Sequence, residues 1–252
     1  GRDSRRVLAL AWLNSRHETG LRSPLDDAIL RHGEVADERW AKIDEVPFDF
    51  ERRRVSVLLE RDGERLLIVK GAPEDVLALS TSQESGAGGG APQPLDDAAR
   101  AALERTRAAL AADGLRTLAI GWRRVAPGHR HAVVDDETEL VFAGWCAFLD
   151  PPKASAGDAI RALARDGVAV RIVTGDEELV ARHVCTALGL AVDAVLTGAD
   201  VAALDEAALA SRVERTTLFC RVAPAQKQRV IRALQRRGHV VGYVGDGIND
   251  AP

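Results

Sequence analysis

Apolar runs and amphipathic stretches alternate along the first half of the chain. The runs 55–59 and 65–69 predict two strands, and the Asp-Gly pair between them is a hairpin turn signal. An amphipathic pattern predicts a helix over 95–112, and further apolar runs predict strands over 116–122 and 140–148. The order of these elements predicts an α+β domain, an antiparallel sheet with helices.

The second half has a different pattern. Three apolar runs, 168–173, 217–222 and 240–244, have the character of buried parallel strands. A helical stretch over 177–188 follows the first run, and a helix beginning at Pro224 follows the second. Strands that alternate with helices predict a doubly wound parallel α/β domain.

The two patterns meet near residue 145, so we predict one domain over 1–145 and a second over 146–252. Residues 81–94 are rich in Ser, Gly and Pro. We expect them to form a flexible loop inside the first domain, because strand-like sequence of that domain resumes beyond them.

Composition narrows the class of protein. The 252 residues are 46% hydrophobic, which is enough for a core in each of two modest domains. A net charge of −4 offers no basic footprint, so we expect no nucleic-acid partner. Cys146, Cys185 and Cys220 are far apart in apolar stretches, which predicts buried free thiols of a reducing compartment. No apolar run approaches the roughly 20 residues of a membrane-spanning helix.

Candidate chemistry is concentrated where the predicted parallel strands end. After 240–244, Gly245 and Gly247 flank a turn that presents Asp246, Asn249 and Asp250. Ligands of open α/β sheets bind at this edge, and these oxygen-bearing side chains suit Mg²⁺. An ordinary turn that caps the next helix has the same composition. The turn alone does not decide between the two.

Two further strand ends favour the chemical interpretation. Thr174 and Asp176 stand at a helix start, where a hydroxyl and backbone N–H groups can seat a phosphate, although a simple N-cap is the alternative. Lys227 lies in the first turn of the helix after Pro224, where its charge opposes the helix dipole. A phosphate partner explains this lysine better than a solvated surface does. The three units together suggest phosphoryl chemistry, with no evident nucleophile among them.

The chain resembles a known family, the P-type cation-transporting ATPases of the haloacid dehalogenase-like superfamily. Motifs similar to those of the family's phosphorylation domain occur in order: Asp-Pro-Pro-Lys at 150–153, Thr-Gly-Asp at 174–176, Lys227, and Gly-Asp-Gly-Ile-Asn-Asp at 245–250. Pro-Phe at 47–48 and Lys-Gly-Ala-Pro-Glu at 70–74 resemble its nucleotide-domain motifs. Segments 13–15, 19–20, 47–54 and 148–153 are most similar to the bacterial magnesium-translocating branch.

The resemblance implies a fold and a function. The first domain would be the nucleotide-binding domain, and the second an incomplete haloacid dehalogenase-like phosphorylation domain. Family members are phosphorylated on the aspartate of an Asp-Lys-Thr-Gly-Thr motif, which this chain does not contain. We therefore expect a soluble piece that binds ATP with Mg²⁺ but neither autophosphorylates nor transports. Its partners would be the actuator and transmembrane domains of the same polypeptide, and the parent protein would couple ATP hydrolysis to cation transport, with Mg²⁺ as the cation suggested by likeness. That protein would present this region at the cytoplasmic face of the plasma membrane.

The resemblance also assigns roles in the first domain. Phe48 would stack on adenine; the alternative is a core phenylalanine, with Phe50 as the expected core member. Lys70 would form a wall of the pocket, and Gly71 would let the ligand come close; an exposed edge-strand lysine is the alternative. Asp26 occupies the place of a glutamate that faces the adenine amino group in many relatives, and a plain helix-face carboxylate is the alternative.

Phosphate contacts are expected from two arginines. Arg116, in the sequence Asp-Gly-Leu-Arg, matches a family position, and Arg53 could do similar work. The alternative for Arg53 is a solvated face, which is the default for a run of three arginines.

The remaining roles belong to the second domain. Asp246 would hold Mg²⁺ together with the missing aspartate, and Asn249 and Asp250 would support that site. Thr174 and Lys227 would neutralise the oxygens of the transferring phosphoryl group.

Two of the matched aspartates have other expected places. Asp176 would lie on the hinge side and Asp150 near the nucleotide.

Two other functions stay open at this stage. A freestanding haloacid dehalogenase-like phosphatase would share the second-domain motifs, but it needs an aspartate nucleophile and has no use for Phe48 or Lys70. A non-catalytic nucleotide-sensing module would keep the first-domain pocket and tolerate loss of the nucleophile.

Overall fold

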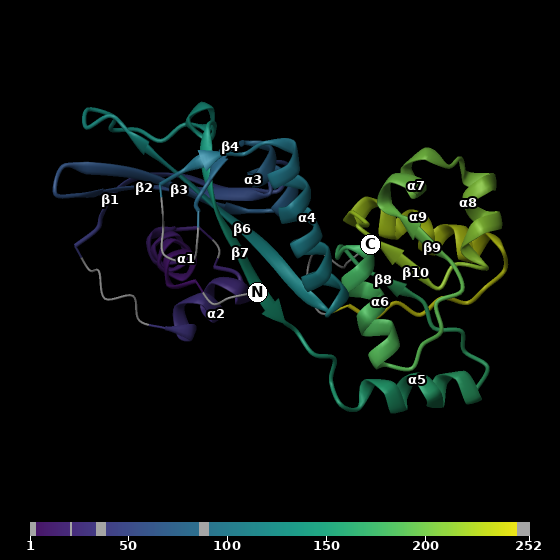
Figure 1. The fold of residues 1–252 in the computed structure, drawn as a ribbon. Coiled ribbons are helices and arrows are strands. Elements are labelled where there is room, and N and C mark those ends of the chain that lie inside the picture. Colours follow the sequence, from purple (N-terminus) through teal and green to yellow (C-terminus); the bar gives the residue numbers. More distant parts are fainter. Residues whose placement is uncertain (1–3, 21, 34–38, 86–90, 246–252) are drawn as a thin grey trace. The chain divides into compact units, whose positions relative to one another are not determined.

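The chain forms two compact units in a computed structural model that describes residues 4–20, 22–33, 39–85 and 91–245 (Figure 1). The first unit comprises residues 1–109 and 117–148, and the second comprises 110–116 and 149–252. Within the described residues, no helix has the length and apolar character needed to cross a membrane.

The first unit is built on a mixed seven-stranded sheet. In spatial order its strands are β1 (Ala41–Asp49), β2 (Arg54–Arg61), β3 (Glu64–Gly71), β6 (Leu115–Val125), β7 (Leu140–Leu149), β4 (Ser80–Gln83) and β5 (Gln93–Pro94). The strands from β1 to β6 pair antiparallel, whereas β4 pairs parallel to β7. The predicted hairpin is confirmed, because β2 and β3 pair along their whole length and Asp62 and Gly63 turn with φ of 51° and 80°.

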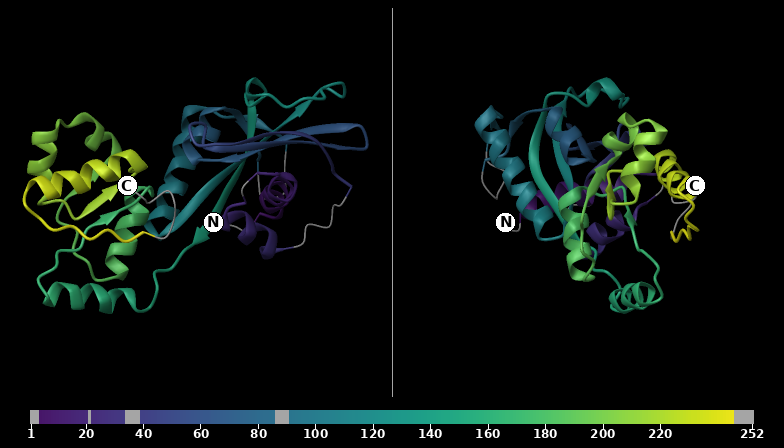
Figure 2. Two further views of the ribbon diagram at one scale, coloured as in Figure 1. Left: turned by 180° about the vertical axis from the view of Figure 1, so that it is seen from behind. Right: turned by 90° about the vertical axis from the view of Figure 1, so that its right-hand side faces the viewer.

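Helices cover both faces of this sheet (Figures 1 and 2). One face packs against α1 (Arg5–His17) and α2 (Pro24–His32), and the other packs against α3 (Pro73–Ala78) and α4 (Asp97–Ala112). Strand alternation divides the side chains: Val57 joins the α1 cluster, whereas Leu58 joins the α3 cluster. Because both faces of the central strands are buried, their register is strongly specified.

One expectation for the first unit is wrong in part. Residues 81–94 are not a loop throughout, because β4 and β5 lie at the two ends of this segment and pair with each other. The parallel pairing of β4 with β7 supplies the long-range partner that local sequence does not reveal. A short 3₁₀ helix (Val134–Asp136) precedes β7.

The second unit contains a three-stranded parallel sheet in the order β8–β10–β9. Its strands are β8 (Ile172–Val173), β9 (Val195–Thr197) and β10 (Leu218–Cys220). Its helices are α5 (Ala156–Arg165), α6 (Glu178–Ala187), α7 (Gly198–Ala203), α8 (Glu206–Val213) and α9 (Pro224–Arg236). The helices predicted after the first two apolar runs are confirmed as α6 and α9.

Both faces of this smaller sheet are covered. Phe219 packs with residues of α7, α8 and α9, and its neighbour Leu218 packs with Ala181 and Cys185 of α6. All four side chains are nearly or fully buried. The unit is therefore an α/β arrangement with helices on both sides of a parallel sheet.

Two predicted strands differ from the structure. The run 168–173 is a strand only at Ile172–Val173, and 240–244 forms no strand at all. Val240 and Val244 are fully exposed rather than buried. An apolar run becomes a strand only where a neighbour accepts its backbone hydrogen bonds, and no strand in the described part of the chain pairs with 240–244.

The three cysteines are free thiols, as predicted. Cys185 and Cys220 are buried, and burial raises the pKa of both. Cys146 is only half-buried as a whole residue, yet burial of its thiol raises its pKa to about 12. None of these thiols has the lowered pKa of a reactive cysteine.

Two strands approach each other closely at Gly71. A Cβ atom there would lie 2.4 Å from the Cβ of Arg54 and 2.6 Å from the carbonyl oxygen of Arg53. The space beside Gly71 is therefore filled by the start of β2, and not by an opening for a ligand.

We expect Gly71→Ala to lower the free energy of unfolding of the first unit by about 2 kcal/mol or more, because backbone atoms must move to admit the methyl group. Gly20→Ala is the matched control, since a Cβ at Gly20 would meet nothing within 4 Å. Urea unfolding of both variants checks this; equal stability of the two would contradict the close approach.

Candidate functional site

Two aromatic side chains are exposed next to each other at the end of β1. Phe48 is 48% exposed and Phe50 is 74% exposed, and their rings meet edge to face with centroids 5.2 Å apart. The expectation that Phe50 is a core residue is wrong. The register of β1 against β2 shifts between Val46 and Asp49, and Phe50 lies in the turn just after the last strand residue, Asp49. An exposed aromatic pair offers a stacking surface to a planar ligand.

A tight turn follows this pair. Asp49 organises it: its Oδ1 accepts hydrogen bonds from the backbone N–H groups of Glu51 and Arg52 at 2.9 and 2.8 Å. The N–H of Arg53 donates to the carbonyl of Asp49 at 2.7 Å, and Arg53 has a left-handed φ of 50°. The turn thus has a defined backbone, and it presents the Arg53 side chain at the surface.

Arg53 is half-exposed and forms two ion pairs. Its Nη1 lies 3.0 Å from Glu74 and its Nη2 lies 2.9 Å from Asp75, both in the first turn of α3. The surface position agrees with the solvated-face alternative, and it also leaves the guanidinium accessible to an anionic ligand.

Lys70 has a very different environment. It is only 4% exposed, on a strand that lies between β2 and β6, so the alternative of an exposed edge-strand lysine is wrong. Its ammonium donates to Ser15 Oγ at 2.8 Å, to Glu18 Oε2 at 3.3 Å and to the carboxylate of Asp26. We call these four residues the Lys70 cluster.

Asp26 belongs both to the Lys70 cluster and to the N-terminal cap of α2. It is 4% exposed, and one of its oxygens accepts from Lys70 and Ser15. The other accepts from the backbone N–H and hydroxyl of Ser23 at 2.9 and 2.7 Å, which completes a capping box at the start of α2. Its carboxylate is therefore held rigidly inside the unit and is not a solvated helix-face group.

The two carboxylates of the cluster are driven in opposite directions. Burial raises the pKa of Glu18 to about 7, an effect that Lys70 only partly offsets and Asp26 reinforces. Burial alone would also raise the pKa of Asp26, but the Lys70 ammonium, assisted by Ser23, holds it well below its usual range. Glu18 Oε1 is buried without a hydrogen-bond partner among the described residues, so it is an acceptor that a ligand could satisfy.

The strand register brings these features to one end of the sheet. Lys70 pairs with Val55, and the next pairs along are Gly71 with Arg54 and Arg54 with Asp49. Two strand spacings, about 10 Å in total, separate β1 from β3. Phe48, Arg53, Asp26, Lys70 and Gly71 therefore all lie at the end of β1–β3 where the turn is formed.

The second unit has its own cluster of predicted residues. Thr174 follows β8 directly, and its N–H donates to the carbonyl of Phe219 while its carbonyl accepts from Val222, at 2.8 and 3.0 Å. Its hydroxyl donates to Asp176 Oδ2 at 3.1 Å and accepts from the Asp176 N–H at the same distance. Lys227 is 7% exposed in the first turn of α9, which begins just after Val222.

Arg116 joins this second cluster rather than the aromatic turn. Its Nε lies 3.1 Å from Asp176 and its Nη1 lies 3.8 Å from Asp150. The sequence placed these three residues in separate roles, and the structure brings them together.

The predicted magnesium ligand Asp246 lies outside the described residues, as do its proposed supports Asn249 and Asp250. Elsewhere, across the part of the chain that the structure describes, no three His, Cys, Asp or Glu residues are grouped in a way that could hold a metal ion.

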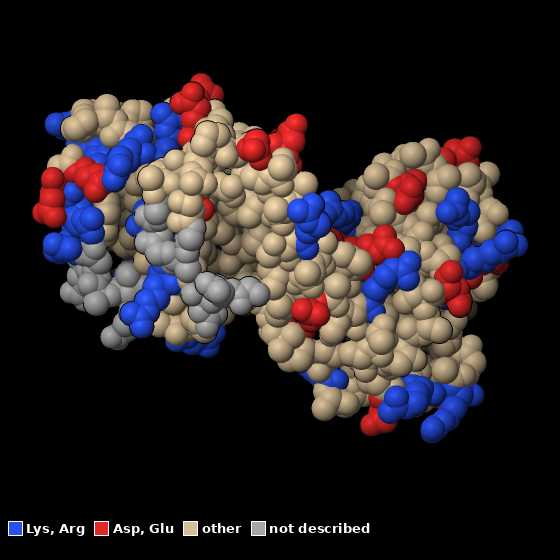
Figure 3. Space-filling view, viewed as in Figure 1, with Lys and Arg blue, Asp and Glu red and all other residues tan. Residues whose placement is uncertain are grey.

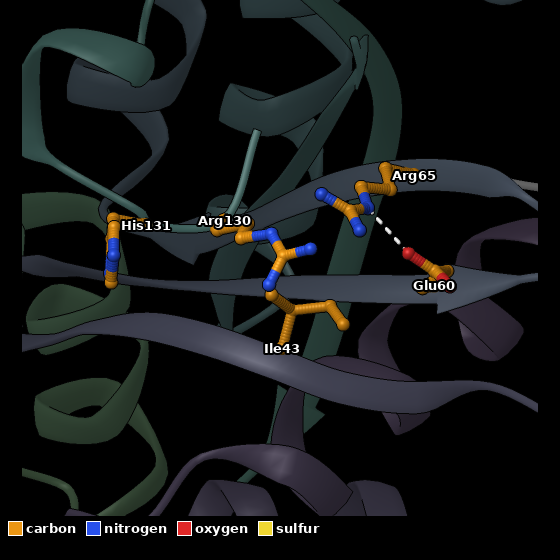
Figure 4. Close-up of a pocket in the computed structure, with 5 residues that line it drawn as sticks. All are labelled: Ile43, Glu60, Arg65, Arg130 and His131. Atoms are coloured by element: carbon orange, nitrogen blue, oxygen red, sulfur yellow. Dashed lines mark hydrogen bonds and ion pairs between the residues drawn. The ribbon is translucent and has the colours of Figure 1, made fainter. Parts of the chain in front are cut away.

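A surface hollow of about 450 Å³ lies elsewhere on the first unit (Figure 4). Its lining residues are Ile43, Glu60, Arg65, Arg130 and His131. Within it, Arg65 Nε donates a hydrogen bond to Glu60 Oε2 at 2.5 Å. Among the described residues, none of those singled out from the sequence lines this hollow.

Surface charge is mixed on the face drawn in Figure 3. Acidic and basic side chains are interspersed there and do not gather into one basic patch.

Sequence reasoning missed two buried carboxylates, Glu18 and Glu137. Glu18 meets Lys70 across 52 residues of chain, and Glu137 meets Arg52 across 85. No spacing rule links residues so far apart, so the partners are visible only in the folded chain.

The chain is similar to several known proteins. A family model described as "P-type ATPase, cytoplasmic domain N" matches residues 11–155. The "Magnesium-transporting ATPase, P-type 1" of Escherichia coli (strain K12) is 42% identical over 261 residues, and that of Salmonella typhimurium (strain LT2) is 46% identical. Both alignments cover 100% of this chain and 28% of the relative. The "Probable cation-transporting ATPase F" of Mycobacterium tuberculosis (strain H37Rv) is 40% identical over 82% of this chain and 23% of its own length. The chain thus spans about a quarter of these relatives.

Glu18→Gln removes the one titration in the Lys70 cluster that falls near neutral pH. Because the folded pKa of about 7 lies above the ordinary 4.5, the wild-type carboxyl contributes stability below pH 4.5 and loses it as pH rises through 7. We expect the free energy of unfolding, wild type minus variant, to fall by up to about 3 kcal/mol over that range. Urea unfolding at a series of pH values measures it.

Glu45→Gln is the matched control for this experiment. Burial opposes the shift, but hydrogen bonds from Thr19 and Lys42 lower the pKa of Glu45. Its difference should therefore rise with pH through the acid range, opposite in sign to that of Glu18. A Glu18 difference that stays flat from pH 4.5 to 7 would show that this carboxyl is not held as described.

Proposed function

The chain belongs to the P-type ATPase family, and on that premise we propose that it is the ATP-binding and partial phosphorylation region of a magnesium-translocating member. By itself this region would bind ATP without forming a phosphoenzyme. In the whole protein it would face the cytoplasm and work with actuator and transmembrane domains, coupling ATP hydrolysis to cation transport.

The observation that carries this proposal is the exposed aromatic pair, which lies at the same end of β1–β3 as the Lys70 cluster. Phe48 lies near the end of β1 and is 48% exposed, and a solvent-facing ring of this kind suits adenine stacking. The unpartnered Glu18 Oε1 adds a hydrogen-bond acceptor for an exocyclic amino group. Asp26 is already engaged by Lys70 and Ser23, so Glu18 is the better candidate for that contact.

Lys70 contributes to such a pocket in a specific way. Its ammonium is held by Ser15, Glu18 and Asp26, so the charge is compensated within the protein before any ligand arrives. Its side chain is only 5% exposed, so its proposed part in the pocket wall is to keep the neighbouring carboxylates in place. Gly71 has no side chain, which lets the start of β2 pack closely against β3 next to the site.

The phosphates would be met by arginines. Arg53 presents its guanidinium at the surface, where a phosphate could replace the carboxylates of Glu74 and Asp75. Arg116 is proposed as a second phosphate contact. A phosphate would there replace the carboxylates of Asp176 and Asp150 as partners of the guanidinium.

In the second unit we propose a phosphoryl-handling role of haloacid dehalogenase-like type. Thr174 is fixed at the end of β8 by backbone bonds to β10, which positions its hydroxyl for a phosphoryl oxygen. Lys227 would supply positive charge from α9, and Asp246, Asn249 and Asp250 would complete the centre. Mg²⁺, when bound by Asp246 and substrate, would neutralise developing negative charge. The phosphorylated aspartate would come from outside this chain.

The phosphatase alternative explains less. It accounts for the second-unit residues but gives no purpose to an exposed Phe48, and the family match at residues 11–155 lies mainly in the first unit.

Calorimetric titration of the chain with ATP and Mg²⁺, combined with an assay of released phosphate, tests the proposal. We expect binding without turnover. Phe48→Ala should weaken binding roughly tenfold, because a base–aromatic stack is worth about 1–3 kcal/mol. Arg53→Ala should weaken it roughly fivefold through loss of a charged contact.

Matched variants control for surface change. Val133→Ala alters a side chain that is 50% exposed, and Arg124→Ala removes a surface arginine paired with Glu64; neither should change ATP affinity. Absence of binding, or sustained release of phosphate, would refute the proposed function.

A further inference from the structure

Glu137 is a fully buried carboxylate that the proposed function does not use. Its side chain has no solvent exposure, and it follows the 3₁₀ helix directly. Arg52 Nη1 donates to both of its oxygens at 2.9 and 3.0 Å, and Arg54 Nε donates to Oε2 at 2.6 Å. Ser56 Oγ donates to Oε1 at 2.5 Å. One buried acid therefore gathers three donor side chains, one from the turn and two from the start of β2.

Through these donors Glu137 reaches the aromatic turn. The Nη2 of Arg52 donates to the carbonyl of Pro47 at 2.6 Å, the residue immediately before Phe48. Arg54 also donates, through Nη1, to the carbonyl of Arg52 at 3.2 Å. The side chains of Arg52 and Arg54 thus tie both ends of the turn to the same buried carboxylate.

This anchor is separate from the Lys70 cluster. Strand alternation puts Ser56 on the same face as Leu58, which packs in the α3 cluster, whereas Lys70 shares a face with Ile68 of the α1 cluster. Glu137 therefore approaches the turn from the opposite side of the sheet, and a change there leaves the Lys70 cluster untouched.

Hydrogen bonds to Asp49 order the backbone within the turn, whereas Glu137 ties the turn to a buried part of the unit. This tie matters because Phe48 and Phe50 are exposed, so their rings do not fix the turn by core packing, and Arg53 adopts an unfavourable left-handed φ. A buried carboxylate with two guanidinium partners is rigid, because displacing any member leaves an uncompensated buried charge.

We propose that Glu137 is a positioning residue for the nucleotide site, which fixes the turn from Pro47 to Arg54 so that Phe48 and Arg53 are set before the ligand arrives. This inference rests on the proposed ATP-binding function. Its physical basis is preorganisation: a turn that is already fixed loses less conformational freedom when the ligand binds.

Glu137→Gln is the test, because the amide keeps the shape but removes the charge that the two arginines require. Glu84→Gln is the matched control: Glu84 is another buried carboxylate of the same unit, 3% exposed, and its described partners are Arg6 and Trp122, which lie outside the turn. ATP affinity with Mg²⁺ and thermal unfolding are measured for both. We expect Glu137→Gln to weaken ATP binding roughly five- to tenfold, and Glu84→Gln to change it by less than about twofold, at comparable losses of stability.

A double-mutant cycle with Phe48→Ala separates positioning from stability. If Glu137 acts by holding Phe48, Glu137→Gln should cost less than about twofold in the Phe48→Ala background. An equal loss in both backgrounds would overturn the positioning role. Unchanged affinity of Glu137→Gln, while Phe48→Ala still weakens binding, would overturn this inference alone; a wild-type chain that binds no ATP would overturn the proposed function as well.

Arg52→Lys keeps the test decisive if Glu137→Gln does not fold. Lysine keeps the positive charge but cannot bridge Glu137 and the Pro47 carbonyl with a planar fork. Arg52→Lys should weaken ATP binding by roughly threefold or more. In the Phe48→Ala background this effect should largely disappear, as for Glu137→Gln. Wild-type affinity in Arg52→Lys would contradict the proposal.

Discussion

The register of the β2–β3 hairpin is the constraint on which the candidate site of the first unit depends. Eight consecutive pairs, from Arg54 with Gly71 to Arg61 with Glu64, join the two strands. Since both faces are buried, a shift of one residue would send Lys70 to the face that holds Ser56, and would separate each from its partners. The Asp-Gly turn and the missing side chain of Gly71 stabilise this register at opposite ends.

Each face of the sheet contains a buried charged side chain, and each of these charges is paired with residues of opposite charge. On the α1 face Lys70 is compensated by Glu18 and Asp26; on the α3 face Glu137 is compensated by Arg52 and Arg54. Such groups add little net stability compared with apolar residues, but each is strongly destabilising when left alone. Their shared position at one end of β1–β3 is the basis for proposing that they hold exposed binding groups in place.

In the second unit, backbone hydrogen bonds hold the candidate residue Thr174 in place. Thr174 is tied to both sides of the end of β10 by its own N–H and carbonyl, and its hydroxyl makes a local ring with Asp176. Parallel strands bring their carboxyl ends to one edge, so residues distant in sequence meet there. Separately, Arg116 forms ion pairs with Asp176 and Asp150, although sequence motifs gave these three residues unrelated roles.

Local pattern alone determined the β2–β3 hairpin, the helices α4, α6 and α9, and the order of motifs that indicates the family, because these depend on neighbours within a few residues. Tertiary structure decided the rest. Whether an apolar run becomes a strand depends on a partner for its backbone, which 172–173 has and 240–244 lacks among the described residues. The exposure of Phe50 depends on a register shift, and the partners of Lys70 and Glu137 come from elements more than 40 residues away, where only folding brings opposite charges into contact.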